Sequence, residues 1–259
     1  MNTLSLVIVG HGRMGRAVEA AARDAGHQIV AIVDPISAQA TRDSLIGIAS
    51  VGAEVAIEFS TPSTAEANCR ALLGAGLPVI CGTTGWNGAL KAVEEEATRN
   101  DVGLLWSPNF SLGIAIAFRL TTLASRWFAG AGDFSPWLFE AHHSGKKDGP
   151  SGTARRLAEL IVEHTPGKTT FGPAPAETVI DHDMLPVAWI RAGSIPGEHR
   201  IGWDAPEESF ELTHRARSRG VFARGALRAA EWIIGQHGPC HFDEFLDEVI
   251  FAPRGPSAT

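Results

Sequence analysis

Residues 140–154 read EAHHSGKKDGPSGTA and concentrate the side chains of this chain that are best suited to moving protons and binding anions. Two adjacent histidines, two adjacent lysines and an aspartate stand directly before a run of small residues. Imidazole and ammonium groups act as general acids or bases when they lie within hydrogen-bond reach of a reacting atom and titrate near neutral pH. The segment therefore predicts acid–base chemistry on an anionic small molecule.

A helix is expected to begin inside this segment. Apolar residues with helical spacing follow it, namely Ala154, Leu157, Ala158 and Ile161. Their pattern places the first turn near residues 151–153, with Ser151 or Thr153 as the cap. Backbone N–H groups around Gly152 and Thr153 would favour a carboxylate, and the glycine has no side chain to obstruct it. For the segment taken alone, a helix cap beside a solvated loop is the alternative interpretation.

A glycine pattern near the N-terminus predicts a dinucleotide site. Gly10, Gly12 and Gly15 have G-x-G-x-x-G spacing after the apolar run LSLVIV and at the start of an amphipathic stretch. The first permits a tight turn, the second lets a pyrophosphate approach the backbone, and the third lets helix and strand pack closely. Asp34 ends the next apolar run, where a carboxylate can accept hydrogen bonds from ribose hydroxyls.

The residues near Asp34 favour NADH only slightly. Pro35 stands where a cation would otherwise neutralise a 2′-phosphate. Arg13, Arg16 and Arg42 are close enough in sequence to reach such a phosphate, so NADPH stays open.

A second glycine-rich turn, CGTTGW, follows a later apolar run. It is expected at the same edge of the sheet, where Gly82, Thr83 and Thr84 can offer backbone and hydroxyl contacts near a nicotinamide. An ordinary tight turn is the alternative interpretation.

The elements that must position these residues alternate up to about residue 106. The apolar runs LSLVIV, QIVAIV, EVAIEF, LPVI and VGLLW are short enough to be strands. Residues 13–25, 63–73 and 86–99 between them have helical periodicity or composition. Repeated strand, helix, strand predicts an α/β fold with a parallel sheet covered by helices.

The pattern changes after Pro108. The helix-like LGIAIAFRLTTLASRWF is followed by WLFEAHH, LPVAWIRAGS, HRIGWD and SFELTHRARS. Partial alternation in the later runs predicts an open mixed or antiparallel sheet, and hence a second domain. Residues 167–183, rich in Pro, Gly and Thr, are expected to form a surface loop. Residues 223–234 and 242–249 are expected to be helical and to return to the first domain.

Bulk properties exclude several classes of function. Of the 259 residues, 44% are hydrophobic, enough for a sizeable core, and the net charge of −7 gives no reason to expect a nucleic-acid partner. Cys69, Cys81 and Cys240 have no metal-ligand spacing and are odd in number, so we expect neither zinc nor structural disulfides. No signal peptide or apolar span of about 18 residues is evident, so we expect a soluble cytoplasmic protein without a membrane partner.

These motifs together resemble the dihydrodipicolinate reductase family, the 4-hydroxy-tetrahydrodipicolinate reductases of diaminopimelate and lysine biosynthesis. EAHHSGKKDGPSGTA resembles the signature E-[LA]-H-H-x-x-K-x-D-A-P-S-G-T-A. GHGRMG, CGTTGW and SPNFSLG resemble the cofactor loop, the GTTG turn and the hinge. IRAGSIPGEHRIGWD and LTHRARSRGVFARGALRAAEWI resemble later segments, so the similarity runs in order over most of the chain.

The resemblance implies an NAD(P)H-dependent reductase with three parts. Residues 1–110 would form a Rossmann-type dinucleotide-binding domain, and residues 111–217 an α+β domain with an open mixed sheet that binds substrate and assembles a homotetramer. Residues 218–259 would be C-terminal helices returning to the first domain. The substrate would be a small dicarboxylate.

Matching positions imply the following roles. His142 and Lys146 would be catalytic, and His143, Ser151, Gly152 and Thr153 would bind substrate. The cofactor would contact Gly10, His11, Gly12, Arg13, Met14, Gly15, Asp34, Gly82, Thr83, Thr84, Ser107, Pro108, Asn109 and Phe110. Gly149 departs from the family pattern, which has alanine there, and is expected to loosen the loop before the carboxylate site.

Two other functions are compatible with parts of the sequence. An aspartate-semialdehyde-type dehydrogenase would use Cys81 as an activated thiolate nucleophile. A non-catalytic dinucleotide sensor would need the glycine pattern and Asp34 but none of the His/Lys cluster.

Overall fold

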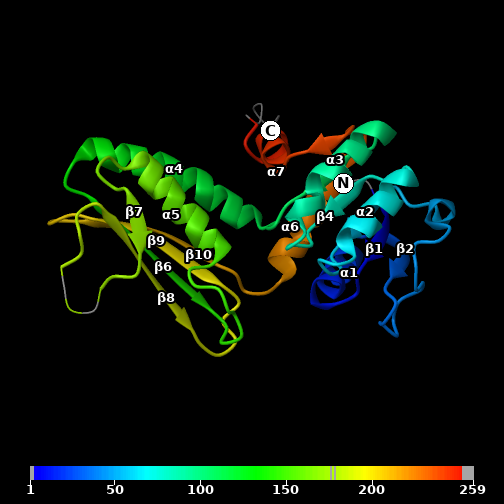
Figure 1. Cartoon of the computed structure of the whole chain (residues 1–259), viewed down its shortest axis with the longest axis horizontal. Helices are drawn as coiled ribbons and strands as arrows, with labels where there is room; N and C mark the ends of the chain where they lie inside the picture. The colour runs from blue at the N-terminus through cyan, green and yellow to red at the C-terminus, as the bar shows by residue number, and fades with distance from the viewer. Residues whose placement is uncertain (1–2, 176, 178, 253–259) are drawn as a thin grey trace, which may run out of the picture. The chain divides into compact units, whose positions relative to one another are not determined.

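The computed structural model describes residues 3–175, 177 and 179–252. They form two compact units, coloured along the chain in Figure 1. Unit 1 contains the chain up to Ser111 and again from Arg219, and unit 2 is Leu112–Ser218.

Unit 1 is built on a parallel sheet of six strands in the order β11-β5-β4-β3-β1-β2. The strands are β1 (Ser5–Val9), β2 (Gln28–Val33), β3 (Val55–Glu58), β4 (Val79–Cys81), β5 (Leu104–Trp106) and β11 (Pro239–Cys240). Residues 55–58 and 79–81 are buried at every position, as is typical of parallel strands covered on both faces. All carboxyl ends lie at one edge of this sheet, as the Rossmann-type prediction requires.

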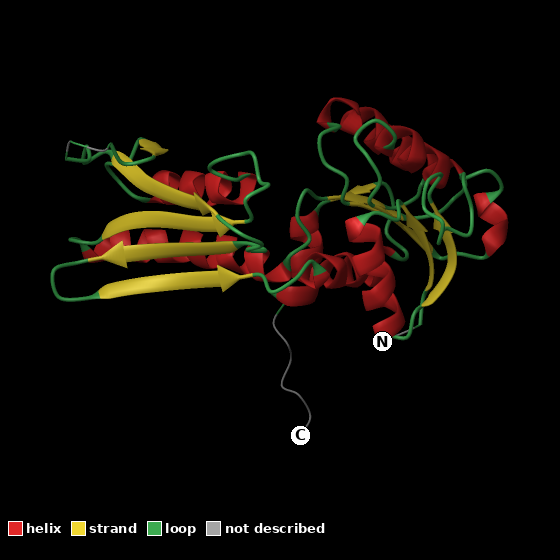
Figure 2. Cartoon of the chain, turned by 90° about the horizontal axis from the view of Figure 1, so that it is seen from below, coloured by secondary structure: helices red, strands yellow, loops and turns green. Residues whose placement is uncertain are grey.

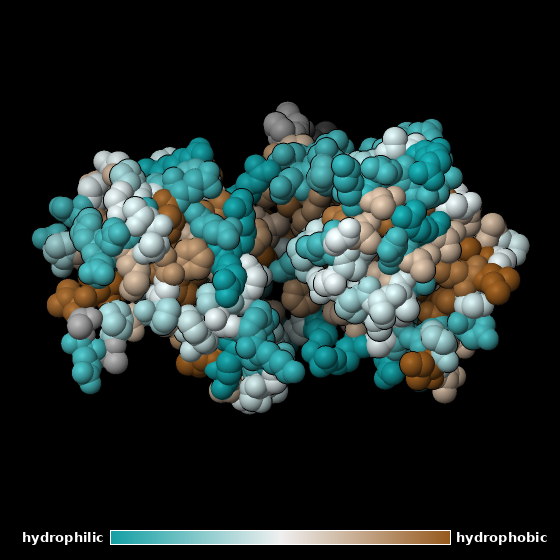
Figure 3. Space-filling model, viewed as in Figure 1, coloured by the Kyte–Doolittle hydropathy of each residue, from teal (hydrophilic) through white to brown (hydrophobic). Residues whose placement is uncertain are grey.

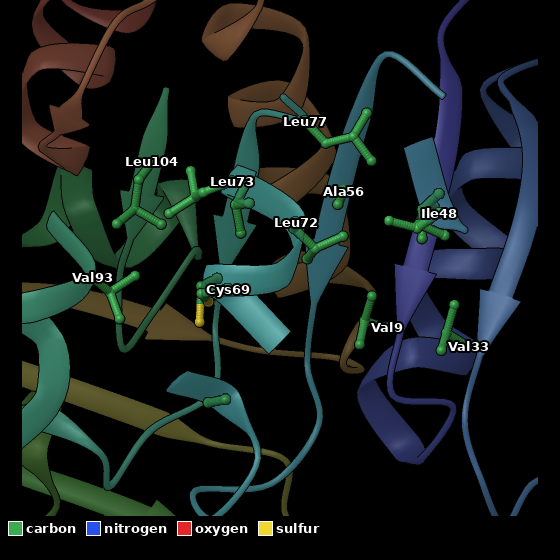
Figure 4. Close-up of a cluster of buried hydrophobic side chains, with 14 of the residues drawn as sticks. Val9, Val33, Ile48, Ala56, Cys69, Leu72, Leu73, Leu77, Val93 and Leu104 are labelled. Carbon is green, nitrogen blue, oxygen red and sulfur yellow. The ribbon is translucent and has the colours of Figure 1, made fainter. Parts of the chain in front are cut away.

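Helices cover both faces of the unit 1 sheet. They are α1 (Arg13–Asp24), α2 (Ala65–Gly74), α3 (Asn87–Asn100), α6 (Gly220–Ile233) and α7 (Phe242–Phe245), with a short 3-10 turn at Ile48–Val51 and a π turn at Leu246–Ile250. Helices α2 and α3 pack on one face, where Leu72, Leu73 and Val93 belong to one buried cluster with Ala56 and Leu104 of the strands (Figure 4). Helix α6 contacts α1 and the strands β3, β4 and β5, so this C-terminal helix packs within unit 1.

Unit 2 is a mixed sheet covered by helices. Strands β6 (Ser135–His142), β7 (Thr170–Gly172), β8 (Met184–Arg191), β9 (Glu198–Asp204) and β10 (Ser209–Arg215) lie in the order β10-β9-β6-β8-β7. Strand β6 runs parallel to β8 and antiparallel to β9, which confirms the predicted mixed sheet. Helices α4 (Leu112–Ala131) and α5 (Gly152–His164) lie on one face (Figure 2).

Two edge strands were not predicted. Strand β7 lies inside the segment 167–183, for which we expected only a loop, and β11 lies between the two predicted C-terminal helices. Each has at most three residues, too few for a period of two to be visible in the sequence. Neighbouring strands supply the hydrogen bonds that define them.

The surface seen in Figure 3 is mostly hydrophilic, with smaller hydrophobic areas between. Among the described residues, none of the helices combines the length and the apolar character that crossing a lipid bilayer demands.

Candidate active site

The glycine turn after β1 has the geometry predicted for each glycine. Gly10 has a φ of +84°, and a β-carbon there would lie 2.4 Å from the carbonyl oxygen of Phe59. A β-carbon on Gly15 would lie 1.9 Å from the carbonyl oxygen of Gly10, so only glycine allows α1 to pack this closely on β1. A β-carbon on Gly12 would meet nothing within 4 Å. The backbone at Gly12 is therefore open at the N-terminus of α1, as a diphosphate group requires.

Asp34 follows directly after β2 and presents an ionised carboxylate at the same edge. Its two oxygens accept hydrogen bonds from the backbone N–H groups of His11 (2.6 Å), Ile36 (2.8 Å) and Ser37 (2.9 Å). Partial burial pushes the pKa of Asp34 upward, but these hydrogen bonds outweigh it and hold the pKa below its usual value. A strong acceptor therefore lies next to the glycine turn.

A pocket of about 550 Å³ opens at this place in unit 1. Three of the residues predicted to bind the cofactor, Gly10, Gly12 and Asp34, line it, and their contact with a cofactor stays a prediction. The pocket is also lined by residues for which the sequence predicted no role, Phe59, Ser60, Thr61, Thr64 and Asn68. The sequence contains FSTPST, a segment rich in hydroxyl residues directly after a strand, and this pattern could have predicted that these residues line a pocket.

A second hollow, of about 530 Å³, lies at the carboxyl ends of β4 and β5. Thr84 and Pro108 line it together with Asn87, Gly88 and Trp106. Thr83 shapes this region through its carbonyl oxygen, which accepts hydrogen bonds from the indoles of Trp86 (2.7 Å) and Trp106 (2.9 Å).

The other predicted cofactor residues lie at the same sheet edge without lining either pocket. His11, Thr83, Ser107 and Phe110 are buried. The imidazole of His11 contacts Glu19 (2.8 Å) and Ser37 (2.9 Å). A β-carbon on Gly82 would lie 2.0 Å from the ring of Phe59, so that glycine is needed for packing. Direct contact with a cofactor stays a prediction for this set, together with Arg13, Met14, Gly15 and Asn109.

The fold also brings together two cysteines that are distant in the sequence. Cys69 from α2 and Cys81 from β4 are fully buried beside Glu58 of β3, and the Cys81 thiol donates to the Glu58 carboxylate at 3.2 Å. Burial raises the pKa of Cys81 well above its usual value, and Cys69 and Glu58 add to the increase. A neutral thiol without access to solvent lacks the features of a nucleophile.

Replacing Cys81 with serine is therefore expected to keep turnover within about twofold of the wild-type value, because serine retains a donor for Glu58 and no thiolate is used. Steady-state assays of Cys81→Ser measure this. A loss of all turnover in a folded variant would restore the thiolate dehydrogenase hypothesis.

Strand register in unit 2 assembles the second group of predicted residues. Glu140 of β6 is paired with His199 of β9 and with Trp189 of β8, and His142 is paired with Arg191. Paired residues share a face of a sheet, and residues two apart on one strand share it too. These five side chains therefore gather on the helix-covered face, beside the start of α5.

Glu140 lies at the centre of this group and is fully buried. Its carboxylate accepts hydrogen bonds from the Ser151 backbone (2.9 Å), the Ser151 hydroxyl and the Arg191 guanidinium (2.6 Å). Burial pushes the pKa of Glu140 upward, but hydrogen bonds from His199, Ser151 and Arg191 reverse this and hold it well below its usual range. Glu140, Arg191 and His199 were not predicted as site residues, because only the folded sheet pairs them.

The surroundings of His142 favour its neutral form. Burial lowers its pKa to about 4, while the Glu140 carboxylate opposes this shift and the cations Lys146 and Arg191 contribute to it. Its Nδ1 atom lies 3.4 Å from Glu140 Oε2. At this distance the two groups interact through charge, and Nδ1 has no hydrogen-bond partner among the described residues.

Lys146 and His143 lie in the loop that links β6 to α5. The Lys146 ammonium contacts the Asp148 carboxylate at 2.8 Å, and the backbone N–H of Lys146 donates to His143 at 3.0 Å. Burial raises the pKa of Asp148, but the hydrogen bond from Lys146 outweighs it and the pKa falls below its usual value. Lys146 is therefore held by one carboxylate on the surface of the loop.

The start of α5 is as predicted, with Ser151 as the cap. The Ser151 hydroxyl accepts from the N–H of Ala154 at 3.2 Å and donates to Glu140, so this side chain is already engaged. A β-carbon on Gly152 would meet nothing within 4 Å, and Thr153 is partly exposed. The open backbone at a helix N-terminus can accept a carboxylate, so substrate binding by Ser151, Gly152 and Thr153 stays a prediction.

The structure gives a physical reason for the glycine at position 149 of this chain. A β-carbon at this position would lie 2.5 Å from Nε1 of Trp189. The indole therefore occupies the space that the methyl group of the family's usual alanine would need. Glycine alone would predict a looser loop at this position, but the side chain of Trp189 packs against it.

Two groups of residues have the ligand types that bind metal ions. Within the part of the chain that the structure describes, these are Glu58 with Cys69 and Cys81, and Glu140 with His142 and His199. The three ligand atoms of each group lie within 4.8 Å of one another. In the second group Arg191 already supplies a positive charge to the carboxylate. Sequence spacing could not have shown either group, since each comes from separate elements.

Comparison with known proteins gives a consistent result over both units. Residues 4–110 match the family model for the N-terminus of dihydrodipicolinate reductase, and residues 113–246 match the model for its C-terminus. The 4-hydroxy-tetrahydrodipicolinate reductase of Christiangramia forsetii is 32% identical over 248 residues, covering 95% of this chain and 99% of that protein. The protein of the same name from Acinetobacter baumannii is 33% identical over 246 residues, covering 87% and 89%.

Among solved structures, the dipicolinate-bound dihydrodipicolinate reductase of Paenisporosarcina sp. TG-14 has a TM-score of 0.77 at 22% identity, with coverage of 96% of this chain and 100% of that chain. A probable dehydrogenase from Thermotoga maritima has a TM-score of 0.62 at 12% identity, with coverage of 93% and 92%. At these identities the structures support the fold, while the sequence matches define the family. On that basis, this chain belongs to the dihydrodipicolinate reductase family.

Proposed function

We propose that this chain is an NAD(P)H-dependent reductase that converts 4-hydroxy-tetrahydrodipicolinate to tetrahydrodipicolinate, a step of diaminopimelate and lysine biosynthesis. The observation that carries the proposal is the joint presence, in a member of this family, of the open glycine turn in unit 1 and the His142, Lys146 and α5 group in unit 2. The substrate is a small dicarboxylate, the class of ligand to which the dipicolinate in the Paenisporosarcina relative belongs.

Unit 1 holds the dinucleotide. The Gly12 backbone and the N-terminus of α1 bind its diphosphate, and Asp34 accepts hydrogen bonds from a ribose. Thr84 and Pro108 line the hollow proposed for the nicotinamide end. Loss of the 4-hydroxyl group as water gives a conjugated ring, and NAD(P)H, when bound, would supply the hydride that reduces it.

Unit 2 binds the diacid and supplies the proton. The N-terminus of α5 at Gly152 and Thr153 binds one carboxylate, with His143 as a further contact. Electron density left by reduction must be protonated, so His142 and Lys146 are assigned as the acid groups. A bound dianion raises the pKa of His142, because an opposite charge nearby favours the imidazolium form.

We further propose a cytoplasmic homotetramer with neither nucleic acid nor membrane as a partner. The sheet face of unit 2 opposite α4 and α5 has a hollow of about 380 Å³ lined by Trp137, Phe139, Ala188 and Arg200. Aromatic residues and arginine on an open sheet face are typical of a contact between subunits.

NADH is expected to be preferred over NADPH by about fivefold in kcat/KM. The pocket beside Asp34 is also lined by Asp43, and its described lining residues include neither lysine nor arginine. Repulsion between the Asp43 carboxylate and a 2′-phosphate near the protein surface would weaken binding of NADPH by on the order of 1 kcal/mol. Parallel assays with both nucleotides measure the ratio, and Asp43→Asn is expected to narrow it. A preference for NADPH would contradict this assignment of the pocket.

The function is tested with freshly formed condensation product of pyruvate and aspartate semialdehyde. We expect NADH oxidation that depends on the chain and on both precursors, with 4-hydroxy-tetrahydrodipicolinate consumed in equal amount. Mixtures lacking either precursor are the controls. Absence of oxidation with either nucleotide, in protein shown to bind NADH, would reject the proposed reaction.

A further inference from the structure

We propose that Glu140 is a positioning residue of the reductase site, one buried carboxylate that holds the proton-donating imidazole, the start of α5 and the lysine loop in place together. This inference rests on the proposed function. The resemblance to the family implied no role for Glu140, which is buried and contacts the proposed site through His142, Ser151 and Arg191.

The first connection is to His142. Both residues lie on β6 two positions apart and therefore on one face, with Nδ1 of His142 at 3.4 Å from Oε2 of Glu140. His199 from the neighbouring strand lies 3.5 Å from the same oxygen. The negative charge of Glu140 on the Nδ1 side favours the tautomer with its proton on Nδ1, although the 3.4 Å contact is not a hydrogen bond. Nε2 is then the nitrogen that can take up a proton, and it lies beside Gly197, where a β-carbon would be 3.2 Å away.

The second connection is to the carboxylate-binding end of α5. Ser151 gives Glu140 both its backbone N–H and its hydroxyl proton, while its own oxygen caps the N–H of Ala154. The N-cap residue of α5 is thus fixed to the sheet by two hydrogen bonds to a charged acceptor. Such bonds are about twice as strong as neutral ones.

The third connection passes through Arg191 to the loop that carries Lys146. The Nη2 atom of Arg191 donates to Glu140 at 2.6 Å and to the backbone carbonyl of Asp148 at 2.5 Å. The Asp148 carboxylate contacts the Lys146 ammonium at 2.8 Å. One chain of contacts therefore runs from the buried carboxylate to the second proposed acid group.

The charge of Glu140 also affects proton transfer. The charged or titratable groups acting on His142 are Glu140 on its own strand, His199 of β9, Arg191 of β8 and Lys146 of the loop. Of these only Glu140 favours the imidazolium form. Removing the negative charge while keeping the side-chain shape must therefore make His142 harder to protonate.

Glu140→Gln tests this role, with Glu198→Gln as the matched control. Glu198 lies on β9 of the same sheet and is paired with Ala141, so its side chain points to the face opposite to that of Glu140 and His142, where it forms ion pairs with Arg200 and Arg215 at 2.6 and 2.7 Å. For Glu140→Gln we expect kcat to fall about tenfold, the KM for the diacid to rise and the KM for NADH to stay constant. The limb of the pH profile assigned to His142 should move to lower pH. Glu198→Gln should keep wild-type kcat and pH profile.

Histidine NMR without substrate separates failure of this inference from failure of the proposed function. With the signal assigned by its loss in His142→Gln, wild-type His142 should titrate near pH 4 and carry its neutral proton on Nδ1. In Glu140→Gln the titration should move lower still. The wild-type tautomer remains measurable even if Glu140→Gln does not fold.

An unchanged His142 titration in folded Glu140→Gln, or a wild-type Nε2–H tautomer, would overturn the positioning role. A loss of activity no larger than the loss of folded protein would show that Glu140 is structural only, and would overturn it too.

Discussion

Replacing Lys146 with alanine is expected to lower kcat by a factor on the order of 10² or more, with the affinity for NADH unchanged. The ammonium group is one of the two proposed acids and adds positive charge beside a dianionic substrate. It contacts only Asp148 among the described side chains, on a partly exposed loop, so its removal leaves the buried group around Glu140 intact. Steady-state kinetics and NADH titration of Lys146→Ala measure both quantities.

Lys147→Ala is the matched control for that variant. Lys147 is the next residue on the same loop and is exposed, so it provides the same charge change without the contact to Asp148. We expect its kcat to stay within about threefold of wild type, since water and salt weaken the interactions of a solvent-exposed charge. Equal losses in the two variants would show that general charge attraction, not proton donation by Lys146, explains the effect.

Gly15→Ala is expected to destabilise the protein by about 3 kcal/mol or more, whereas Gly12→Ala is expected to fold normally and bind NADH at least tenfold more weakly. At Gly15 the added methyl would lie 1.9 Å from a backbone carbonyl that cannot move without displacing the turn. At Gly12 the methyl would meet open space, and the φ of −77° suits any residue. That open space is where a diphosphate is proposed to approach.

Urea unfolding and NADH titration of the two variants distinguish these outcomes. Each glycine serves as the control for the other, because both changes add one methyl group within the same turn. Wild-type NADH affinity in Gly12→Ala would place the diphosphate elsewhere. Wild-type stability in Gly15→Ala would show that α1 can move away from β1 at little cost.

Local patterns in the sequence predicted most of the elements of both units. The strand at Ser5–Val9 and the helix at Arg13–Asp24 were predicted because a change from an apolar run to a helical period is visible within a few residues. The cap at Ser151 followed from the same kind of local rule. Strands β7 and β11 were missed because hydrogen bonds to their neighbours, rather than their own residues, define them.

By itself the sequence determined the family, the two kinds of sheet and the motifs that carry the proposed chemistry, because these depend on residues close together along the chain. Only the tertiary structure decided that Glu140, Arg191 and His199 surround His142, that Cys81 is a buried neutral thiol, and that Trp189 occupies the space beside Gly149. Each of these depends on strand pairing or side-chain burial between distant segments. Register and burial set hydrogen bonds and pKa values, and neither quantity is fixed by local spacing.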